Sequence, residues 1–172
     1  MKKLLVILLL TLVAMSSTIA PVAAADGNAS AAVALYIDTS GHYVPGVDLL
    51  NKALNEVIRF KINALFLGSE VQSGNEVLRD LNRCNINSAA DATPEGLAQY
   101  GKDRHVNYII LLSTRPLDVA LDLKAFSTAD TAYIVDKTVT RPDGTEAASV
   151  LDTLSDMVGN EVAQVLQTIH GS

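Results

Sequence analysis

A short polar stretch at positions 38–43 holds the residue types that nucleophilic and acid–base chemistry use. A serine hydroxyl becomes a nucleophile when a histidine accepts its proton and a carboxylate orients that histidine. The stretch directly follows an apolar run, and loops after the strands of a parallel sheet are where α/β proteins bind ligands. The alternative is a solvated loop rich in turn formers. The candidate ligand or partner residues here are Asp38, Ser40, His42 and Tyr43.

The sequence lacks the motifs that would make this stretch catalytic. The chain has 3 histidines, His42, His105 and His170, and none lies four residues from another in a metal-ligand spacing. The nucleophile-elbow pattern G-x-S-x-G, the P-loop pattern and the dinucleotide-binding glycines are all missing. We therefore expect no catalytic residue, no metal and no cofactor. Distant segments could still assemble a triad, because triads are defined by geometry.

Arg115 is the remaining candidate residue, in the turn that Thr114-Arg115-Pro116-Leu117-Asp118 predicts after an apolar strand. An ion pair with Asp118 would fix this corner of the chain. Alternatively, the guanidinium would present a cation to a partner, because it offers several donors in a rigid plane.

The apolar pattern predicts the elements that position these residues. Ala31–Ile37 is rich in β-formers and predicts a buried strand. Apolar residues at spacings of three and four predict a helix from Val47 to about Arg59. A second apolar run favours a strand across Lys61–Val71. Ser73 and Glu76 fit a capping box, in which the Ser73 hydroxyl accepts from the Glu76 amide at the start of a helix.

The second half of the chain predicts another helix, three strands and a closing helix. Thr93 as cap and Pro94 in the first turn open a helix that ends near Arg104, at His105. Tyr108–Leu112 is apolar on both faces and predicts the central strand, with Ile110 and Leu111 fully buried. The closing apolar stripe either packs on the sheet or forms a dimer seam. The remaining strands and this helix are expected at Val119–Phe126, Tyr133–Val139 and Val150–Ile169.

The first 25 residues have the three parts of a secretory signal peptide. Lys2 and Lys3 give a positive start, Leu4–Met15 is apolar, and small residues precede the cut. The apolar run is shorter than the ~20 residues of a membrane-spanning helix. We expect cleavage after Ala25, or after Ala24, and export to the periplasm or the exterior. No lipid anchor and no mature transmembrane segment are expected, because no cysteine lies near the cut.

Composition narrows the partners. The chain of 172 residues has 19 acidic and 13 basic side chains and a net charge of −6, and removal of Lys2 and Lys3 makes it more acidic. We therefore expect no binding to nucleic acid or to anionic membranes. Cys84 is the single cysteine, so no intramolecular disulfide can form. It is either a buried hydrophobe on a helix face or a thiol that pairs between chains.

The predicted order of elements is β-α-β-α-α-β-β-β-α. The first half alternates strands and helices, as α/β proteins do, and the second half is a three-strand meander with an α+β tendency. No repeat, linker or second core interrupts the pattern. We therefore expect residues 26–172 to form a single α/β domain with a mixed sheet.

Three stretches resemble, in chain order, parts of a group of bacterial envelope domains. Val33–Gly41 resembles their first strand and loop, Leu97–Lys102 with Val106–Ile110 their helix and central strand, and Val150–Ile169 their closing helix. The group includes the N-terminal domain of the Tol-Pal propeller protein, the curli secretion lipoprotein and the outer-membrane lipoprotein activators of penicillin-binding proteins. This chain departs from the group because it has no lipidated cysteine and because His105 stands where a glycine is usual.

The resemblance implies a non-enzymatic interaction or scaffolding module of the cell envelope whose partner is another envelope protein. A homodimer is a further arrangement that we consider. The alternative function is a small-ligand binder or hydrolase with its site at the loop from Asp38 to Tyr43. In an enzyme, Asp38, Ser40 or His42 should lie in a pocket together with groups from the end of another strand. In a scaffold, the same loop should lie on a shallow surface.

Overall fold

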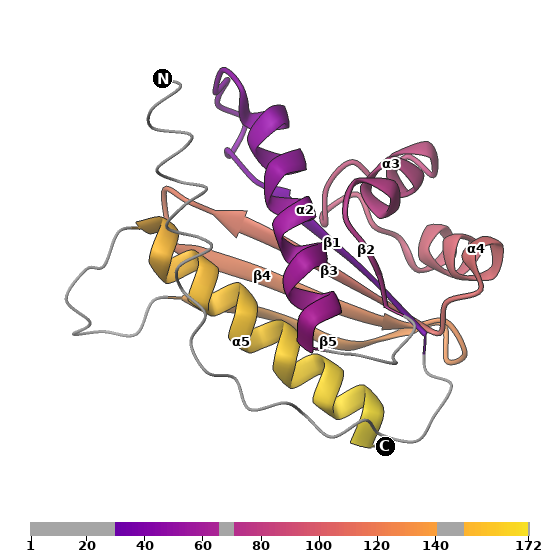
Figure 1. Cartoon of the computed structure of the whole chain (residues 1–172). Coiled ribbons are helices and arrows are strands. Elements are labelled where there is room, and N and C mark those ends of the chain that lie inside the picture. The colour runs from indigo at the N-terminus through magenta and orange to yellow at the C-terminus, as the bar shows by residue number, and fades with distance from the viewer. Residues whose placement is uncertain (1–29, 66–70, 141–149, 172) are drawn as a thin grey trace.

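A five-stranded mixed sheet with helices on both faces forms the protein in the computed structural model, which describes residues 30–65, 71–140 and 150–171 (Figure 1). The predicted order of elements and the α/β fold class are confirmed. The predicted signal peptide lies outside the described residues. The elements are β1 (Ala31–Ile37), α2 (Val47–Leu65), β2 (Val71–Ser73), α3 (Asn75–Arg83), α4 (Pro94–Arg104), β3 (Tyr108–Arg115), β4 (Ala120–Ser127), β5 (Ala132–Thr140) and α5 (Val150–Gly171).

The strands lie in the order β2-β1-β3-β4-β5, so β3 is central as the sequence predicts. β1 runs parallel to both β2 and β3, whereas β3, β4 and β5 form an antiparallel meander. Ile110 and Leu111 on β3 are both 0% exposed, which confirms their predicted burial. Because β1 and β3 are parallel neighbours, their carboxyl ends and the loops that follow them lie at the same end of the sheet.

Each face of the sheet carries its own apolar core. α2 and α5 cover one face, and α3 and α4 cover the other (Figure 1). The stripe on α5 packs on the sheet, which confirms the first of its two predicted roles. The buried members of that stripe are Leu154, Met157, Val158, Val162, Val165, Leu166 and Ile169.

The strand predicted across Lys61–Val71 is wrong. α2 continues to Leu65, residues 66–70 lie outside the described residues, and the strand described after them is Val71–Ser73. Ile58 and Ile62, one helical turn apart, are both buried in the core of the α2/α5 face. Helical spacing therefore continued through the apolar run, and the run itself was mistaken for a strand.

The capping box predicted at Ser73 is also wrong. The N-cap of α3 is Gly74, with φ 88° and ψ −164°, and it makes no side-chain cap hydrogen bond. Ser73 is still part of β2, where it pairs with Val33. A carboxylate from α2 caps the helix instead, because Glu56 Oε1 accepts from the Asn75 amide at 3.0 Å.

The predicted start and end of α4 are confirmed. The Thr93 hydroxyl accepts from the Gly96 amide at 3.2 Å, and Pro94 opens α4. His105 ends the helix in the left-handed conformation at φ 55°, the backbone conformation that favours glycine. The strand expected from Val119 begins one residue later, because Val119 itself has φ 47°.

A buried asparagine completes the edge of β1 where β2 stops. β2 pairs with β1 only from Ala31 to Val33. Two residues further on, the side chain of Asn55 on α2 bonds both peptide groups of Leu35: its Oδ1 accepts from the amide at 2.9 Å, and its Nδ2 donates to the carbonyl at 2.7 Å. Asn55 is 1% exposed. This one side chain therefore does what a neighbouring strand would do.

Candidate functional site

The polar stretch predicted as a site is an exposed loop at the carboxyl end of β1. Asp38, Ser40, His42 and Tyr43 are all exposed. The Asp38 amide donates to the carbonyl of Thr114 on β3 at 2.8 Å, which ties the loop to the end of the neighbouring strand. The loop therefore starts from a fixed point of the sheet.

Contacts inside the loop are local. Asp38 Oδ1 accepts from the Ser40 amide at 2.7 Å, and His42 Nδ1 lies 3.0 Å from the Thr39 carbonyl. These bonds close a turn in which Ser40 has φ 53°. No hydrogen bond joins the Ser40 hydroxyl to the His42 ring among the contacts of this described loop. The loop thus holds the residue types of a nucleophilic site without the contact that would activate the serine.

Large apolar side chains are exposed at this end of the sheet, in the loops that hold Tyr43 and Leu117 and in the first turn of α2, which holds Leu49. Tyr43 is 89% exposed, Leu117 is 73% exposed and Leu49 is 63% exposed. Leu117 lies in the turn after β3, three residues beyond the Thr114 carbonyl that holds Asp38. We call the exposed Tyr43, Val44, Leu49 and Leu117 the carboxyl-end surface. The sequence identified only Tyr43 of these, since a single leucine in a turn carries no signal of its own.

Arg115 holds the corner between β3 and β4. Its Nε and Nη2 donate to both oxygens of Asp122, at 2.9 and 3.2 Å, and its Nη1 donates to Asp118 at 3.1 Å. The Thr138 hydroxyl donates to the same Asp122 at 2.6 Å, so the network spans β3, β4 and β5. The hydrogen bonds to Asp122 raise the pKa of Arg115, and the nearby Asp38 adds to that shift.

The arrangement around Arg115 matches the structural interpretation of the sequence. The ion pair with Asp118 is present, but the bidentate bond is to Asp122, which the sequence did not pair with it. The pairing depends on the strand register, because Ser113 lies opposite Asp122 and places Arg115 beside it. The sequence signal that could have pointed to Asp122 is the alternation of apolar and polar residues along β4, which places Asp122 on the polar face of that strand.

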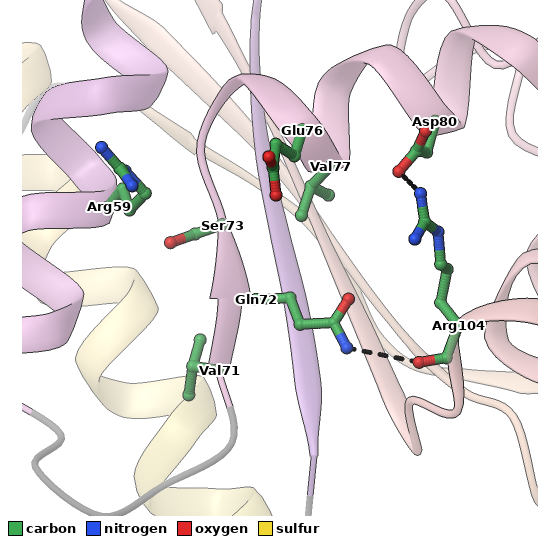
Figure 2. Close-up of a pocket in the computed structure, with 8 residues that line it drawn as sticks. All are labelled: Arg59, Val71, Gln72, Ser73, Glu76, Val77, Asp80 and Arg104. Atoms are coloured by element: carbon green, nitrogen blue, oxygen red, sulfur yellow. Dashed lines mark hydrogen bonds and ion pairs between the residues drawn. The ribbon is translucent and has the colours of Figure 1, made fainter.

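A hollow that the sequence did not predict runs along the outer edge of β2 (Figure 2). Its volume is about 240 Å³. Three consecutive strand residues line it although their side chains alternate between the two faces, so the hollow lies beside the strand and not on one face. Figure 2 shows Arg59 on one side of β2 and Arg104 on the other. The lining residues are Arg59, Val71, Gln72, Ser73, Glu76, Val77, Asp80 and Arg104.

One lining residue has an unused polar group. Ser73 is 9% exposed, and its buried Oγ has no hydrogen-bond partner. Gln72 on the opposite face donates from Nε2 to the Arg104 carbonyl at 3.2 Å. The strand that borders the hollow therefore carries a free hydroxyl on the α2 side and a bonded amide on the α4 side.

Arginines gather around this hollow. Asp80 is buried, and the guanidinium groups of Arg79, Arg83 and Arg104 all form ion pairs with it. Arg59 pairs with Glu56 on α2 at 2.6 Å. These four are among the six arginines of a chain whose net charge is −6. Three of these arginines share the single carboxylate of Asp80, so guanidinium groups outnumber carboxylates around it.

The described residues contain no group of three or more His, Cys, Asp or Glu side chains that could hold a metal ion. Over the same ranges, none of the helices has the length and hydropathy needed to cross a membrane. Cys84 is free and partly buried at the end of α3, where it packs against the core of the α3/α4 face. Pairing of this thiol between chains stays a prediction.

The chain matches no family model, and no curated protein matches its sequence. Its fold is similar to lipoprotein GNA1162 from Neisseria meningitidis, at 14% identity and a TM-score of 0.44 over 79% of this chain and 99% of that one. It is also similar to TolB from Acinetobacter baumannii, at 13% identity and a TM-score of 0.43 over 85% of this chain and 30% of TolB.

A third similar structure is the LpoB C-terminal domain from Salmonella enterica, at 15% identity and a TM-score of 0.38 over 68% of this chain and 88% of that one. TolB and LpoB belong to groups that the sequence resembles. The solved structures that match are therefore of the kind that the sequence resembles, at low identity and low TM-score.

Proposed function

We propose that this protein is an exported component of the bacterial cell envelope that binds another envelope protein and catalyses no reaction. The observation that carries the proposal is the carboxyl-end surface, where Tyr43 is 89% exposed and Leu117 is 73% exposed. Exposed aromatic and aliphatic side chains gathered at one end of a fold are typical of protein contact surfaces. Tyrosine suits such a surface because its ring is apolar and its hydroxyl tolerates water.

The backbone beneath this surface supports the proposal. Asp38 is bonded to Thr114, and Arg115 bridges Asp118 and Asp122 in the turn that carries Leu117. Loops that are held in place before binding lose less conformational entropy when the complex forms. The polar loop residues therefore have a role as supports of a contact surface.

The competing function is a hydrolase or small-ligand binder at the same loop. That function needs a general base within hydrogen-bond reach of the Ser40 hydroxyl. The His42 ring instead lies 3.0 Å from the Thr39 carbonyl. This geometry favours binding over catalysis.

The proposed export rests on the signal-like start of the sequence. We propose that residues 1–25 are removed, with the cut after Ala25 or after Ala24, and that the protein resides in the periplasm. Mass spectrometry of protein recovered from the envelope fraction should give an N-terminus at Asp26 or Ala25. Recovery of the full-length chain from the cytoplasm contradicts the proposed location.

The contact surface is tested by photo-cross-linking in the producing cells. A photoreactive residue at position 43 should give a discrete adduct with another envelope protein. The same probe at position 60 is the control, because Phe60 is 79% exposed on α2 but lies about 20 Å further along the helix. An adduct of equal strength at both positions contradicts the proposal.

Binding of the purified partner then gives the quantitative test. The double variant Tyr43→Ser and Leu117→Ser should weaken affinity at least about tenfold, while Phe60→Ser leaves it unchanged. An adduct formed only with a second copy of this chain points to a homodimer instead. Hydrolysis of a model ester that disappears in Ser40→Ala supports the competing function.

A further inference from the structure

The outer edge of β2 has peptide groups that no strand of the described residues uses. β2 is the end strand of the sheet, with β1 on one side only. The bonds from Asn55 show that the peptide groups of Leu35 point toward the β2 side of β1. Strand residues alternate in this direction, so Ala31 and Val33 point the same way.

The register then tells which groups of β2 face outward. Val33 lies opposite Ser73, and Ala31 lies opposite Val71. In a parallel pair, a residue that points toward its neighbour bonds to the residues before and after its opposite. Gln72 therefore turns its peptide groups toward β1, while Val71 and Ser73 turn theirs outward. These two residues present the pattern that an added strand requires.

The hollow at this edge supplies space for such a strand. Its walls are side chains from both faces of β2, and its volume is about 240 Å³. Side chains of an added strand would alternate in the same way as those of β2. One would point toward Arg59 on the α2 side, and the next toward Arg104 on the α4 side (Figure 2).

The charge of the site selects the occupant. The lining of the hollow has two arginines, Arg59 and Arg104, and two carboxylates, Glu76 and Asp80. Beside it, Arg79 and Arg83 also pair with Asp80, and Glu56 pairs with Arg59, which makes four arginines and three carboxylates in all. The local balance is thus positive by one charge, on a chain whose net charge is −6. Electrostatic complementarity favours acidic partners at such a patch and disfavours basic ones.

The position of Arg59 over the hollow is set by a glycine. Gly74 follows β2 with φ 88°, and a Cβ built there would lie 2.9 Å from Arg59 Cδ. A side chain at this position would push the arginine away. Ser73 Oγ, buried without a partner, adds one uncommitted group beside it.

We propose that the edge of β2 binds an extended acidic segment of a partner protein by strand addition. Main-chain bonds to Val71 and Ser73 hold the segment, and two adjacent carboxylates reach Arg59 and Arg104. This site is separate from the carboxyl-end surface and does not use its residues. The two proposals therefore succeed or fail independently.

A set of short peptides tests the proposal on the purified protein. The probe is fluorescein-labelled Thr-Val-Glu-Glu-Val-Thr with blocked ends, followed by fluorescence anisotropy. It should bind, and its Gln-Gln analogue should bind at least about fivefold more weakly. The Lys-Lys analogue should not bind. A peptide with both Glu amides N-methylated should lose binding, because it keeps its charge and loses its main-chain donors.

Two matched variants locate the site. Arg59→Gln should weaken the probe about fivefold, since it removes one of the two arginines that flank β2. Lys52→Gln on the same helix is the control and should bind like the unchanged protein. Hydrogen exchange should slow at the amide of Ser73 when the probe is bound, and the amide of Leu117 should be unaffected.

Several results would overturn the proposal. The first is no binding of the Glu-Glu probe up to about 1 mM. The second is equal binding of the N-methylated peptide, which would show attraction by charge alone. A third is equal loss in Arg59→Gln and Lys52→Gln. Self-association of the protein that Arg59→Gln abolishes would make a second copy the occupant and would also overturn it.

Discussion

The two edges of the sheet are built in opposite ways. β2 has three residues, all uncharged, and lies beside a hollow with arginines on both sides. β5 has nine residues, and Asp136 and Lys137 occupy its middle. Antiparallel pairing of β5 with a second copy centred on Asp136 would oppose Asp136 to Asp136, and pairing centred one residue later would oppose Lys137 to Lys137. Like charges opposite one another destabilise strand pairs.

The two edges show that a longer edge strand need not pair more readily with another chain. The long edge carries its charge within the strand, which guards it against self-pairing. The short edge carries its charge on neighbouring helices, which leaves the strand backbone free and selects the sign of a partner. Substitutions at Asn55, Gly74 and Lys137 test this difference, and two buried tyrosines test the same reasoning in the core.

The largest expected loss of stability is at Asn55, whose side chain bonds the peptide groups of Leu35 beyond the end of β2. Asn55→Leu should destabilise the protein by about 2–5 kcal/mol, because it leaves the buried amide and carbonyl of Leu35 without partners. Urea unfolding measures the loss. Lys52→Leu, at an exposed position of the same helix, is the control and should change stability by less than about 1 kcal/mol. Equal losses in the two variants would mean that Asn55 does not complete the edge.

Gly74→Ala should cost about 1–3 kcal/mol, because φ 88° with ψ −164° is a conformation that essentially only glycine adopts. It should also weaken binding of the acidic probe by displacing Arg59. Gly46→Ala is the matched control, since Gly46 has φ 83° but nothing within 4 Å of its Cβ position. That variant should lose stability and keep probe binding. Weaker probe binding in both variants would contradict the role of Gly74.

On the β5 edge, Lys137 forms an ion pair with the buried Glu161 of α5 at 2.7 Å. Lys137→Met should cost about 1–2 kcal/mol, because the carboxylate is left buried with its charge unmatched. The same variant removes a charge from the strand, so sedimentation should show more self-association than for the control Lys102→Met. A monomeric, fully stable Lys137→Met protein would show that this residue does not guard the edge.

The smallest effect separates two buried tyrosines. The Tyr36 hydroxyl donates to the Ile86 carbonyl at 3.0 Å, whereas the Tyr100 hydroxyl has no partner. Tyr36→Phe should therefore cost about 1 kcal/mol, and Tyr100→Phe should be neutral or stabilising. The two variants together test whether the loss of stability depends on the hydrogen bond that the removed hydroxyl makes in the folded protein. Urea midpoints that fall equally for both variants would contradict it.

Both tyrosines also predict a pH dependence. Burial raises the pKa of Tyr36 and of Tyr100 in the folded protein. The folded state then keeps a proton that the unfolded state releases above about pH 10. The contribution of these two tyrosines to stability should be constant below that pH and fall above it. The fall should be smaller in either Phe variant, as measured by urea unfolding at neutral and alkaline pH.

Local signals were sufficient for most of the fold. β3 was identified as central because Tyr108–Leu112 is apolar on both faces, and α4 because Thr93 and Pro94 mark its start. The end of α2 was missed because an apolar run of helix and strand look alike over a short window. The cap at Ser73 was missed because its pattern says nothing of the strand pairing that holds this serine in β2.

The candidate sites were predicted less well, for a physical reason. The sequence could pair Arg115 with Asp118 because they are three residues apart. The bond to Asp122 and the hollow beside β2 join residues that only the strand order brings together. Asn55 gave no signal at all, because its partners are main-chain groups on another element.

At Leu35 the Asn55 side chain takes the place of a neighbouring strand, and this affects the order in which the sheet can fold. Leu35 and Asn55 are 20 residues apart, so this closure is local and its entropic cost is low. β1 and α2 can therefore settle as a pair before the residues beyond α2 arrive. β2 then pairs with β1 only at Ala31–Val33, because Asn55 already bonds the peptide groups of Leu35. If β2 detaches, these bonds to Leu35 remain. We therefore expect β2, the strand that borders the arginines, to detach and return more readily than the rest of the sheet.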